Sequence, residues 1–290
     1  MSKIYWDKIR ILVTNRCNYA CPFCHNEGQK KGKSYTDMPY SSLKQIIDYI
    51  EDQGLSEICF SGGEPFLNES ILSMIRYAED NTPCDISCAS NFSLITPMQI
   101  KQLQGSRVKF NIQFPYANNE DFKRSSRIGD FDHILKNIDI ARNSGIKIGL
   151  NSVIQEIDTL KLEELISFSI KNELPLKLLP QIGLKDSHSF KDIVYPILKK
   201  HAIGYYDKGT GATRWTLKAR GLSTTVLYID SPCFTKDTAI CRRYSEIRIH
   251  PNMDIQSCIL KDPVDTLQLS NGKEYVLEQF RKSWKNLNRC

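Results

Sequence analysis

The chain contains 290 residues, of which 41% are hydrophobic, and it carries ten cysteines and a formal net charge of +6. This length allows one large hydrophobic core or two smaller ones. The charged N-terminus lacks the apolar segment of a signal peptide, and no apolar run is long enough to cross a bilayer, so we expect a cytoplasmic protein without a membrane partner.

The first 180 residues alternate short β-branched runs with longer helical patterns, which is typical of parallel βα units. A sheet of such units places its functional loops at the carboxyl ends of the strands. The predicted strands are Ile9–Thr14, Glu57–Ser61, Asp85–Ser90, Val108–Gln113, Lys147–Val153 and Leu176–Leu179.

Helices are predicted between these strands. Apolar residues at helical spacing follow Pro39, and Asn68 is expected to cap a second helix that carries Ile71 and Ile75. Thr96 and Pro97 open a third helix with an N-cap and a proline in its first turn. Further helices are expected at about residues 131–143, 160–172 and 190–200.

Three cysteines follow the first predicted strand closely. Cys17, Cys21 and Cys24 have the spacing C-x3-C-x2-C, which can turn three thiolates toward a common point, as an iron–sulfur cluster requires. Zinc sites and disulfides favour an even number of cysteines. Three protein ligands would leave one iron of a four-iron cluster open.

A glycine-rich loop follows the second predicted strand, with the sequence Gly62-Gly63-Glu64-Pro65. Two glycines let the backbone come close to a ligand, and Glu64 offers a carboxylate to an ammonium group. The alternative is an ordinary turn between a strand and a helix. Cys59, Cys84 and Cys88 lie inside strand runs, where we interpret them as small buried hydrophobic residues.

Beyond about residue 203, glycines separate the β-prone runs Thr213–Lys218 and Thr224–Ile229. A β-hairpin is predicted from Ile247–His250 and Ile255–Cys258. A second set of cysteines lies in this part of the chain, and it consists of Cys233, Cys241, Cys258 and the last residue, Cys290. Unrelated buried cysteines are the alternative interpretation.

The cysteine loop, with Phe23 before its third cysteine, and the Gly62–Pro65 loop together resemble the radical S-adenosylmethionine (SAM) superfamily. The resemblance implies an α/β fold with a partial (β/α)6 barrel at residues 1–203, a 4Fe–4S cluster, and SAM bound at its open iron. Cleavage of SAM then gives a 5′-deoxyadenosyl radical that abstracts hydrogen from the substrate. By this resemblance the SAM-binding residues are Phe23, Gly62, Gly63, Glu64, Pro65, Ser90, Asn91, Gln113 and Asn151.

Residues 204–290 resemble the small β-rich auxiliary-cluster ("Twitch") domain of many radical SAM enzymes, which implies a second 4Fe–4S cluster at Cys233, Cys241 and Cys258. Cys290 is either a fourth ligand or a frayed end. The whole pattern is most similar to the GTP 3′,8-cyclases of molybdenum-cofactor biosynthesis. Their substrate-contacting cations correspond here to Arg10, Lys177 and Arg248, whereas Glu57, Cys59, Gly149 and Glu246 stand where that group has basic residues.

We therefore expect a radical SAM enzyme that acts on a small molecule or nucleotide, with a reducing partner such as flavodoxin or ferredoxin and no nucleic-acid partner. Losing several basic contacts would weaken the binding of a triphosphate, so GTP itself is not the expected substrate. Modification of a peptide side chain, nucleotide dehydration as in viperin, and a non-catalytic iron–sulfur electron carrier are the alternatives.

Overall fold

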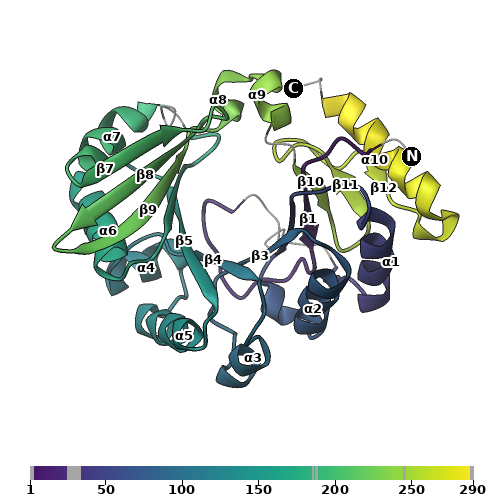
Figure 1. The fold of residues 1–290 in the computed structure, drawn as a ribbon, viewed down its shortest axis with the longest axis horizontal. Helices are drawn as coiled ribbons and strands as arrows, with labels where there is room; N and C mark the ends of the chain where they lie inside the picture. Colours follow the sequence, from purple (N-terminus) through teal and green to yellow (C-terminus); the bar gives the residue numbers. More distant parts are fainter. Residues whose placement is uncertain (1–2, 25–33, 185, 187–188, 244–245, 288–290) are drawn as a thin grey trace.

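The computed structural model describes residues 3–24, 34–184, 186, 189–243 and 246–287, and these form one twelve-stranded sheet. The strand order is β12-β11-β10-β1-β2-β3-β4-β5-β6-β9-β8-β7. The sheet curves into an open barrel with helices on its outer side (Figure 1). The strands are β1 Lys8–Leu12, β2 Glu57–Ser61, β3 Asp85–Ser90, β4 Lys109–Gln113, β5 Lys147–Ile154, β6 Leu176–Pro180, β7 Ala202–Asp207, β8 Ala212–Ala219, β9 Leu222–Ile229, β10 Glu246–Ile249, β11 Asp254–Gln256 and β12 Asp265–Thr266.

The strands from β10 through β1 to β6 and on to β9 run parallel, while β11, β12, β8 and β7 join the two edges in antiparallel pairs. The predicted mixed α/β class with a parallel sheet is therefore confirmed. The six strands predicted for the barrel are all present, and β2 and β3 have the predicted bounds.

The helices that connect the parallel strands, α1 to α6, lie on the outer face of the sheet (Figure 1). The helix bounds are α1 Tyr40–Ile50, α2 Ile71–Asn81, α3 Pro97–Gln102, α4 Asn119–Ser126, α5 Phe131–Asn143, α6 Thr159–Lys171, α7 Lys191–Lys199, α8 Pro232–Thr235, α9 Thr238–Arg243 and α10 Lys273–Asn286, with a short 3₁₀ turn at Pro65–Leu67. Thr96 caps α3 in a capping box as expected. The predicted cap at Asn68 is wrong: α2 begins after Ser70, and the Asn68 amide donates instead to Val13 O and Met38 O.

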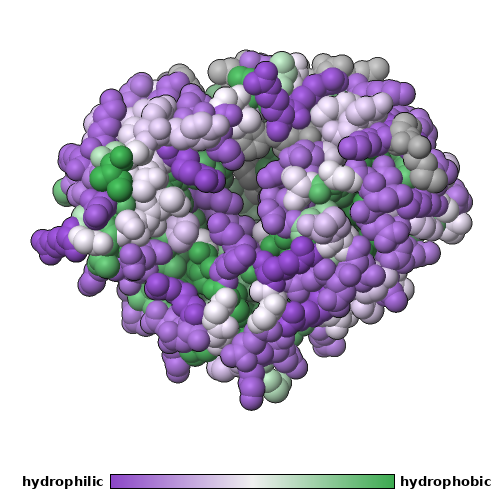
Figure 2. All heavy atoms as spheres, in the orientation of Figure 1, coloured by the Kyte–Doolittle hydropathy of each residue, from purple (hydrophilic) through white to green (hydrophobic). Residues whose placement is uncertain are grey.

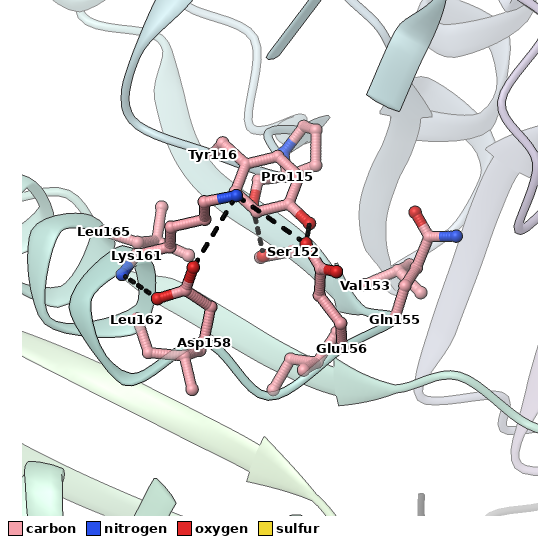
Figure 3. A pocket seen from close by; sticks show the side chains of 11 residues that line it. Pro115, Tyr116, Ser152, Val153, Gln155, Glu156, Asp158, Lys161, Leu162 and Leu165 are labelled. Atoms are coloured by element: carbon pink, nitrogen blue, oxygen red, sulfur yellow. Dashed lines mark hydrogen bonds and ion pairs between the residues drawn. The ribbon is translucent and has the colours of Figure 1, made fainter. Parts of the chain in front are cut away.

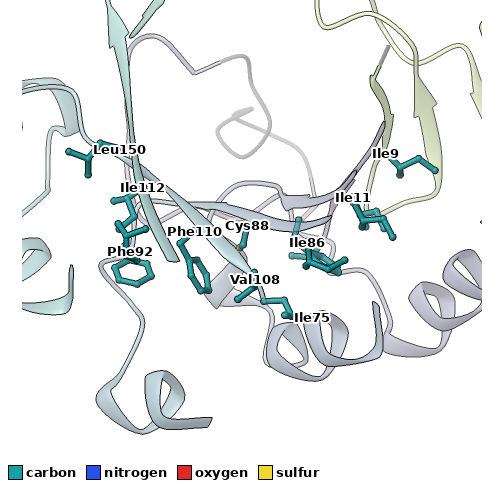
Figure 4. Close-up of a cluster of buried hydrophobic side chains, with 14 of the residues drawn as sticks. Ile9, Ile11, Ile75, Ile86, Cys88, Phe92, Val108, Phe110, Ile112 and Leu150 are labelled. Carbon is teal, nitrogen blue, oxygen red and sulfur yellow. The ribbon is translucent and has the colours of Figure 1, made fainter. Parts of the chain in front are cut away.

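Alternation along each strand separates the core from the inside of the barrel. Ile9, Ile11, Phe110 and Ile112 pack outward against the helices in the cluster drawn in Figure 4. Because neighbouring side chains on a strand face opposite sides, the residues between them point inward. The inner positions include Arg10, Cys59, Lys109, Asn111, Gln113, Gly149, Asn151, Lys177, Glu246 and Arg248.

The C-terminal part of the chain completes both edges of the barrel. β9 pairs with β6, and β10 pairs with β1 in the register Arg10↔Arg248. The predicted hairpin is present as β10 and β11, although Cys258 lies two residues after β11 ends. In Figure 1, α8 and α9 lie across the opening between the two edges. Strands on both sides of residue 203 thus share one sheet, and the division into two domains stays a prediction.

The helix α10 returns to the start of the chain. The buried indole of Trp6 donates to Phe280 O at 2.9 Å, and Trp284 packs edge-on against the Trp6 ring at a centroid distance of 5.0 Å. Within the described residues, no helix combines the length and the apolar character that a membrane span requires.

Replacing Phe110 should lower the stability of the whole barrel. Its ring is fully buried and lies 5.2 Å from the Phe92 ring and 6.0 Å from the Phe66 ring, centroid to centroid. Phe110→Ala is expected to reduce the free energy of unfolding by about 3–5 kcal/mol, measured by urea unfolding of the metal-free protein. Leu160→Ala, at a side chain that is 78% exposed, is the control and should change it little. Equal values for the two variants would contradict the packing described here.

Candidate active site

The cysteine loop leaves the end of β1 and folds over the mouth of the barrel. Cys21 is buried with Tyr19 and Phe23, and Cys17 and Val153 pack against this group. Burial and the neighbouring thiols of Cys17 and Cys24 raise the pKa of Cys21 to about 12. Burial raises the pKa of Cys17 to about 11. Both thiols are therefore protonated at neutral pH unless a cation offsets this cost.

The donor set of three cysteines fits an iron–sulfur cluster, which takes thiolates, and the positive metal charge favours their formation. Cys17, Cys21 and Cys24 are the residues that would hold it.

The glycine loop after β2 lies against the backbone of the cysteine loop. Gly63 N donates to Thr14 O at 2.9 Å, and Glu64 N donates to Arg16 O at 2.7 Å. A Cβ at position 62 would be 2.4 Å from Thr14 O, and one at position 63 would be 1.8 Å from Arg16 O. The two glycines are therefore required by the contact between the two loops, whatever ligand they also approach.

Glu64 is fully buried next to these glycines and joins the ends of β2 and β3. Its carboxylate accepts from Ser90 Oγ at 2.7 Å, Asn91 N at 2.7 Å and Phe66 N at 3.2 Å. Burial raises the pKa of Glu64 to about 7, although these hydrogen bonds oppose the rise. The predicted set of Glu64, Ser90 and Asn91 thus comes together, and Pro65 is buried beside it.

Asn91 connects this set to the cysteine loop. Its Nδ2 donates to Asn18 Oδ1 at 2.8 Å, and Asn18 Nδ2 donates to Ser93 Oγ at 2.8 Å. Sequence reasoning missed Asn18, although its position directly after Cys17 was a signal. A continuous set of hydrogen bonds therefore runs from Glu64 to the cysteine loop.

Gln113 and Asn151 are register partners on β4 and β5, both on the inner face. Gln113 Nε2 and Asn151 Oδ1 are buried and have no hydrogen-bond partner in the described parts of the chain. Leaving a buried donor and a buried acceptor unpaired costs free energy, so such a pair calls for a ligand or a water. A hydroxyl group, which both donates and accepts, would satisfy this need.

The second cysteine set converges at the mouth of the barrel. Cys233 on α8, Cys241 on α9 and Cys258 after β11 line one cavity of about 340 Å³ and a neighbouring one of about 140 Å³. Figure 2, in the orientation of Figure 1, shows the molecule hollowed near its centre. Cys290 lies outside the described residues. The remaining walls of the larger cavity are mainly apolar, and they include Trp6, Val153, Leu179, Ile182, Ile229 and Ile259.

Two of the predicted substrate-binding cations are held by one carboxylate. Arg10 donates from Nε and Nη2 to the two oxygens of Glu246 at 2.7 and 2.9 Å, and Arg248 donates from Nε and Nη2 to Glu246 Oε1 at 3.3 and 3.2 Å. Burial alone would raise the pKa of Glu246, but the two arginines outweigh it and lower the pKa to about 2. Glu246 and Arg248 both line the larger cavity.

The third predicted cation, Lys177, donates to Asn111 Oδ1 at 3.0 Å. Lower in the barrel, Glu57 pairs with Lys8 at 2.7 Å and accepts from Ser87 Oγ at 2.5 Å. Cys59 is buried on the inner face of β2, two residues after Glu57. Lys177 therefore contacts an inner-face polar group, Asn111, that sequence reasoning missed, although the two-residue period of β4 could have identified it.

A further pocket lies at the ends of β4 and β5, below Tyr116 and beside α6 (Figure 3). Its volume of about 20 Å³ holds roughly one water. Lys161 lies 3.7 Å from both Glu156 and Asp158 at its edge, and the Lys161 ammonium also faces the Tyr116 ring. The pocket is too small for a substrate.

Comparison with known proteins gives one consistent result. Residues 11–168, more than half of the chain, match the radical SAM superfamily. The GTP 3′,8-cyclase of Clostridium perfringens (strain SM101 / Type A) is 23% identical over 269 residues, which cover 87% of this chain and 80% of the relative. SuiB of Streptococcus suis bound to S-adenosylmethionine has a TM-score of 0.77 at 15% identity and covers 98% of this chain and 68% of its own. The structure of SuiB bound to precursor peptide SuiA has a TM-score of 0.74 at the same identity and covers 98% and 67%. The predicted fold class and resemblance are confirmed.

The pair of arginines on Glu246 predicts a specific pH dependence. Because the pKa of Glu246 is about 2 in the folded protein and 4.5 ordinarily, its contribution to stability is complete above pH 4.5 and is lost as the pH falls toward 2. Glu246→Gln should therefore lower the free energy of unfolding at neutral pH and flatten its fall across this range, in urea unfolding of the metal-free protein. Glu163→Gln, at a carboxylate that pairs with Lys200 on the surface, should leave the profile unchanged. A Glu246→Gln profile parallel to that of the wild type would contradict the charge assignment.

Proposed function

Because the chain belongs to the radical SAM superfamily, we propose that this radical SAM enzyme modifies a small molecule at the mouth of its barrel, with a second 4Fe–4S cluster beside the substrate. When bound, the first cluster and SAM supply an electron to the sulfonium and a 5′-deoxyadenosyl radical that takes hydrogen from the substrate. The observation that carries this proposal is the arrangement of both cysteine sets at the same end of one barrel.

Residues of the barrel are proposed to bind and orient SAM. Gln113 Nε2 and Asn151 Oδ1 would pair with its ribose hydroxyls, because both atoms are otherwise unsatisfied. Glu64 would face its ammonium group, with the carboxylate fixed by Ser90 and Asn91. Val153 packs against the cysteine loop and also lines the larger cavity, so it would separate the two sites by only one side chain.

The second cluster is proposed at Cys233, Cys241 and Cys258. Its support is that these cysteines come from three different segments of the chain and line the same cavity. Three ligands would leave one iron open to the substrate, whereas a fourth ligand from Cys290 would close the cluster. A flavodoxin or ferredoxin is the proposed reducing partner.

The substrate is proposed to differ from GTP. The relative from Clostridium perfringens is named a GTP 3′,8-cyclase, but here Arg10 and Arg248 both donate to the carboxylate of Glu246. A peptide side chain is the second candidate, because the cavity is mainly apolar and the similar SuiB has been solved with its precursor peptide. The second cysteine set argues against a viperin-like dehydratase, which lacks it.

Replacing Cys17, Cys21 and Cys24 together by alanine should abolish the reductive cleavage of SAM. These thiols would hold the only cluster with a SAM-binding iron, so 5′-deoxyadenosine should not form when the anaerobically reconstituted variant is reduced with dithionite. The variant should keep about four irons per chain at the second set. Production of 5′-deoxyadenosine by this variant would overturn the assignment.

Replacing Cys233, Cys241 and Cys258 together by alanine should give the opposite result. About four irons per chain should be lost, while the first cluster still cleaves SAM in the absence of substrate. Iron content equal to that of the wild type would remove the second cluster from the proposal. Cys290→Ser tests the fourth ligand: unchanged iron content, with a spectral change on adding substrate, would support an open cluster.

A further inference from the structure

Two lysines face the inside of the barrel from the two strands that flank β5. Lys109 is the first residue of β4 and Lys177 is the second of β6, and both lie on the inner face with β5 between them. In the described parts of the chain neither forms a salt bridge, and the ammonium of Lys177 contacts Asn111. Burial lowers the pKa of Lys177, the charge of Lys109 lowers it further, and the carboxylate of Glu57 opposes the fall.

Gly149 on β5 makes room for Lys109. A Cβ at position 149 would be 3.1 Å from Lys109 Cε and 3.5 Å from Lys109 Nζ. The lysine side chain therefore passes over the glycine toward the strand that carries Lys177. Position 149 on β5 has no charged side chain, and Lys109 on the neighbouring strand β4 supplies a positive charge there.

Three other cations of the inner face are paired with carboxylates. Glu246 accepts from both forks of Arg10 and Arg248, and Glu57 accepts from Lys8. An arginine whose Nε and Nη2 both donate to a carboxylate cannot present the same fork to a phosphate. Lys109 and Lys177 form no salt bridge in the described parts of the chain, so their ammonium groups are suited to bind an anionic group of a ligand.

One member of the pair, Lys177, lies on the strand that also forms a wall of the apolar cavity under the second cysteine set. Lys177 is two residues before Leu179 on the same face of β6, and Leu179 lines that cavity. The ligand that these surroundings match has one charged end and an apolar body.

We propose that the substrate carries a single carboxylate or phosphate group, which Lys109 and Lys177 bind, and an apolar body that occupies the cavity beside Cys233, Cys241 and Cys258. This inference rests on the proposed function and adds the substrate class. Two ammonium groups match the charge of one phosphate or exceed that of one carboxylate, whereas a nucleoside triphosphate brings about four negative charges. Lys109 is then a specificity-determining residue that the resemblance to cyclases does not indicate.

Binding of three probe anions tests the proposal. The full-length, anaerobically reconstituted protein with SAM is titrated calorimetrically with phenyl phosphate, 3-phenylpropionate and GTP. We expect phenyl phosphate or 3-phenylpropionate to bind more tightly than GTP. The tighter-binding of these two probes shows whether the substrate carries a phosphate or a carboxylate. Tighter binding of GTP, or no binding of either aromatic probe at millimolar concentrations, would overturn the proposal.

Four variants locate the anionic group. Lys109→Met and Lys177→Met should each lower the affinity for the aromatic probe about tenfold or more. Lys136→Met, at an exposed lysine of α5, should leave this affinity unchanged. Glu246→Gln should raise the affinity for GTP about tenfold, because it releases two arginine forks. Unchanged affinity in both lysine variants, with native circular dichroism and iron content, would overturn the proposal.

The formation of 5′-deoxyadenosine by the wild type is measured separately. Its absence would refute the proposed function. The binding pattern of the probes would still decide whether Lys109 and Lys177 form an anion site.

Discussion

The structure depends on the direct contact between two loop backbones at the mouth of the barrel. Gly63 N and Glu64 N donate to carbonyls of the cysteine loop, and no side chain fits at either glycine. This contact fixes the loop after β1 against the loop after β2, so that the positions of Cys17 and Glu64 are set together. A cluster and a ligand that must meet within a bond length require such coupling, because a small displacement of either loop would separate them.

The alternation of side chains on the strands gives the two faces of the sheet different roles. Outward residues such as Phe110 and Ile112 provide the buried apolar area that stabilises the fold. Inward residues such as Arg10, Glu246 and Lys177 are polar, and burying them costs free energy unless they are paired. Glu246 offsets part of this cost by pairing with two arginines.

Local patterns in the sequence were sufficient for much of the fold. The βα periodicity, the cap at Thr96 and the bounds of α5 depend on neighbouring residues, and the structure agrees with them. α4 was missed because its sequence is mostly polar and only Phe122 marks a buried face. The pairing of β10 with β1, the position of Lys109 over Gly149 and the capture of Arg10 by Glu246 join residues that are distant in sequence. Periodicity carries no information about such contacts.

The position of β1 also has a consequence for folding while the chain is being synthesised on the ribosome. β1 lies inside the sheet, between β2 and β10, and its contact with Glu246 spans 236 residues. Until the last part of the chain emerges, β1 is an edge strand with unpaired backbone groups, which is the kind of edge that associates with other chains. A closure over so long a loop is also slow. Nascent chains that stall before β10 would therefore hold the cysteine loop without a finished barrel wall, and they are the species that chaperones would need to protect.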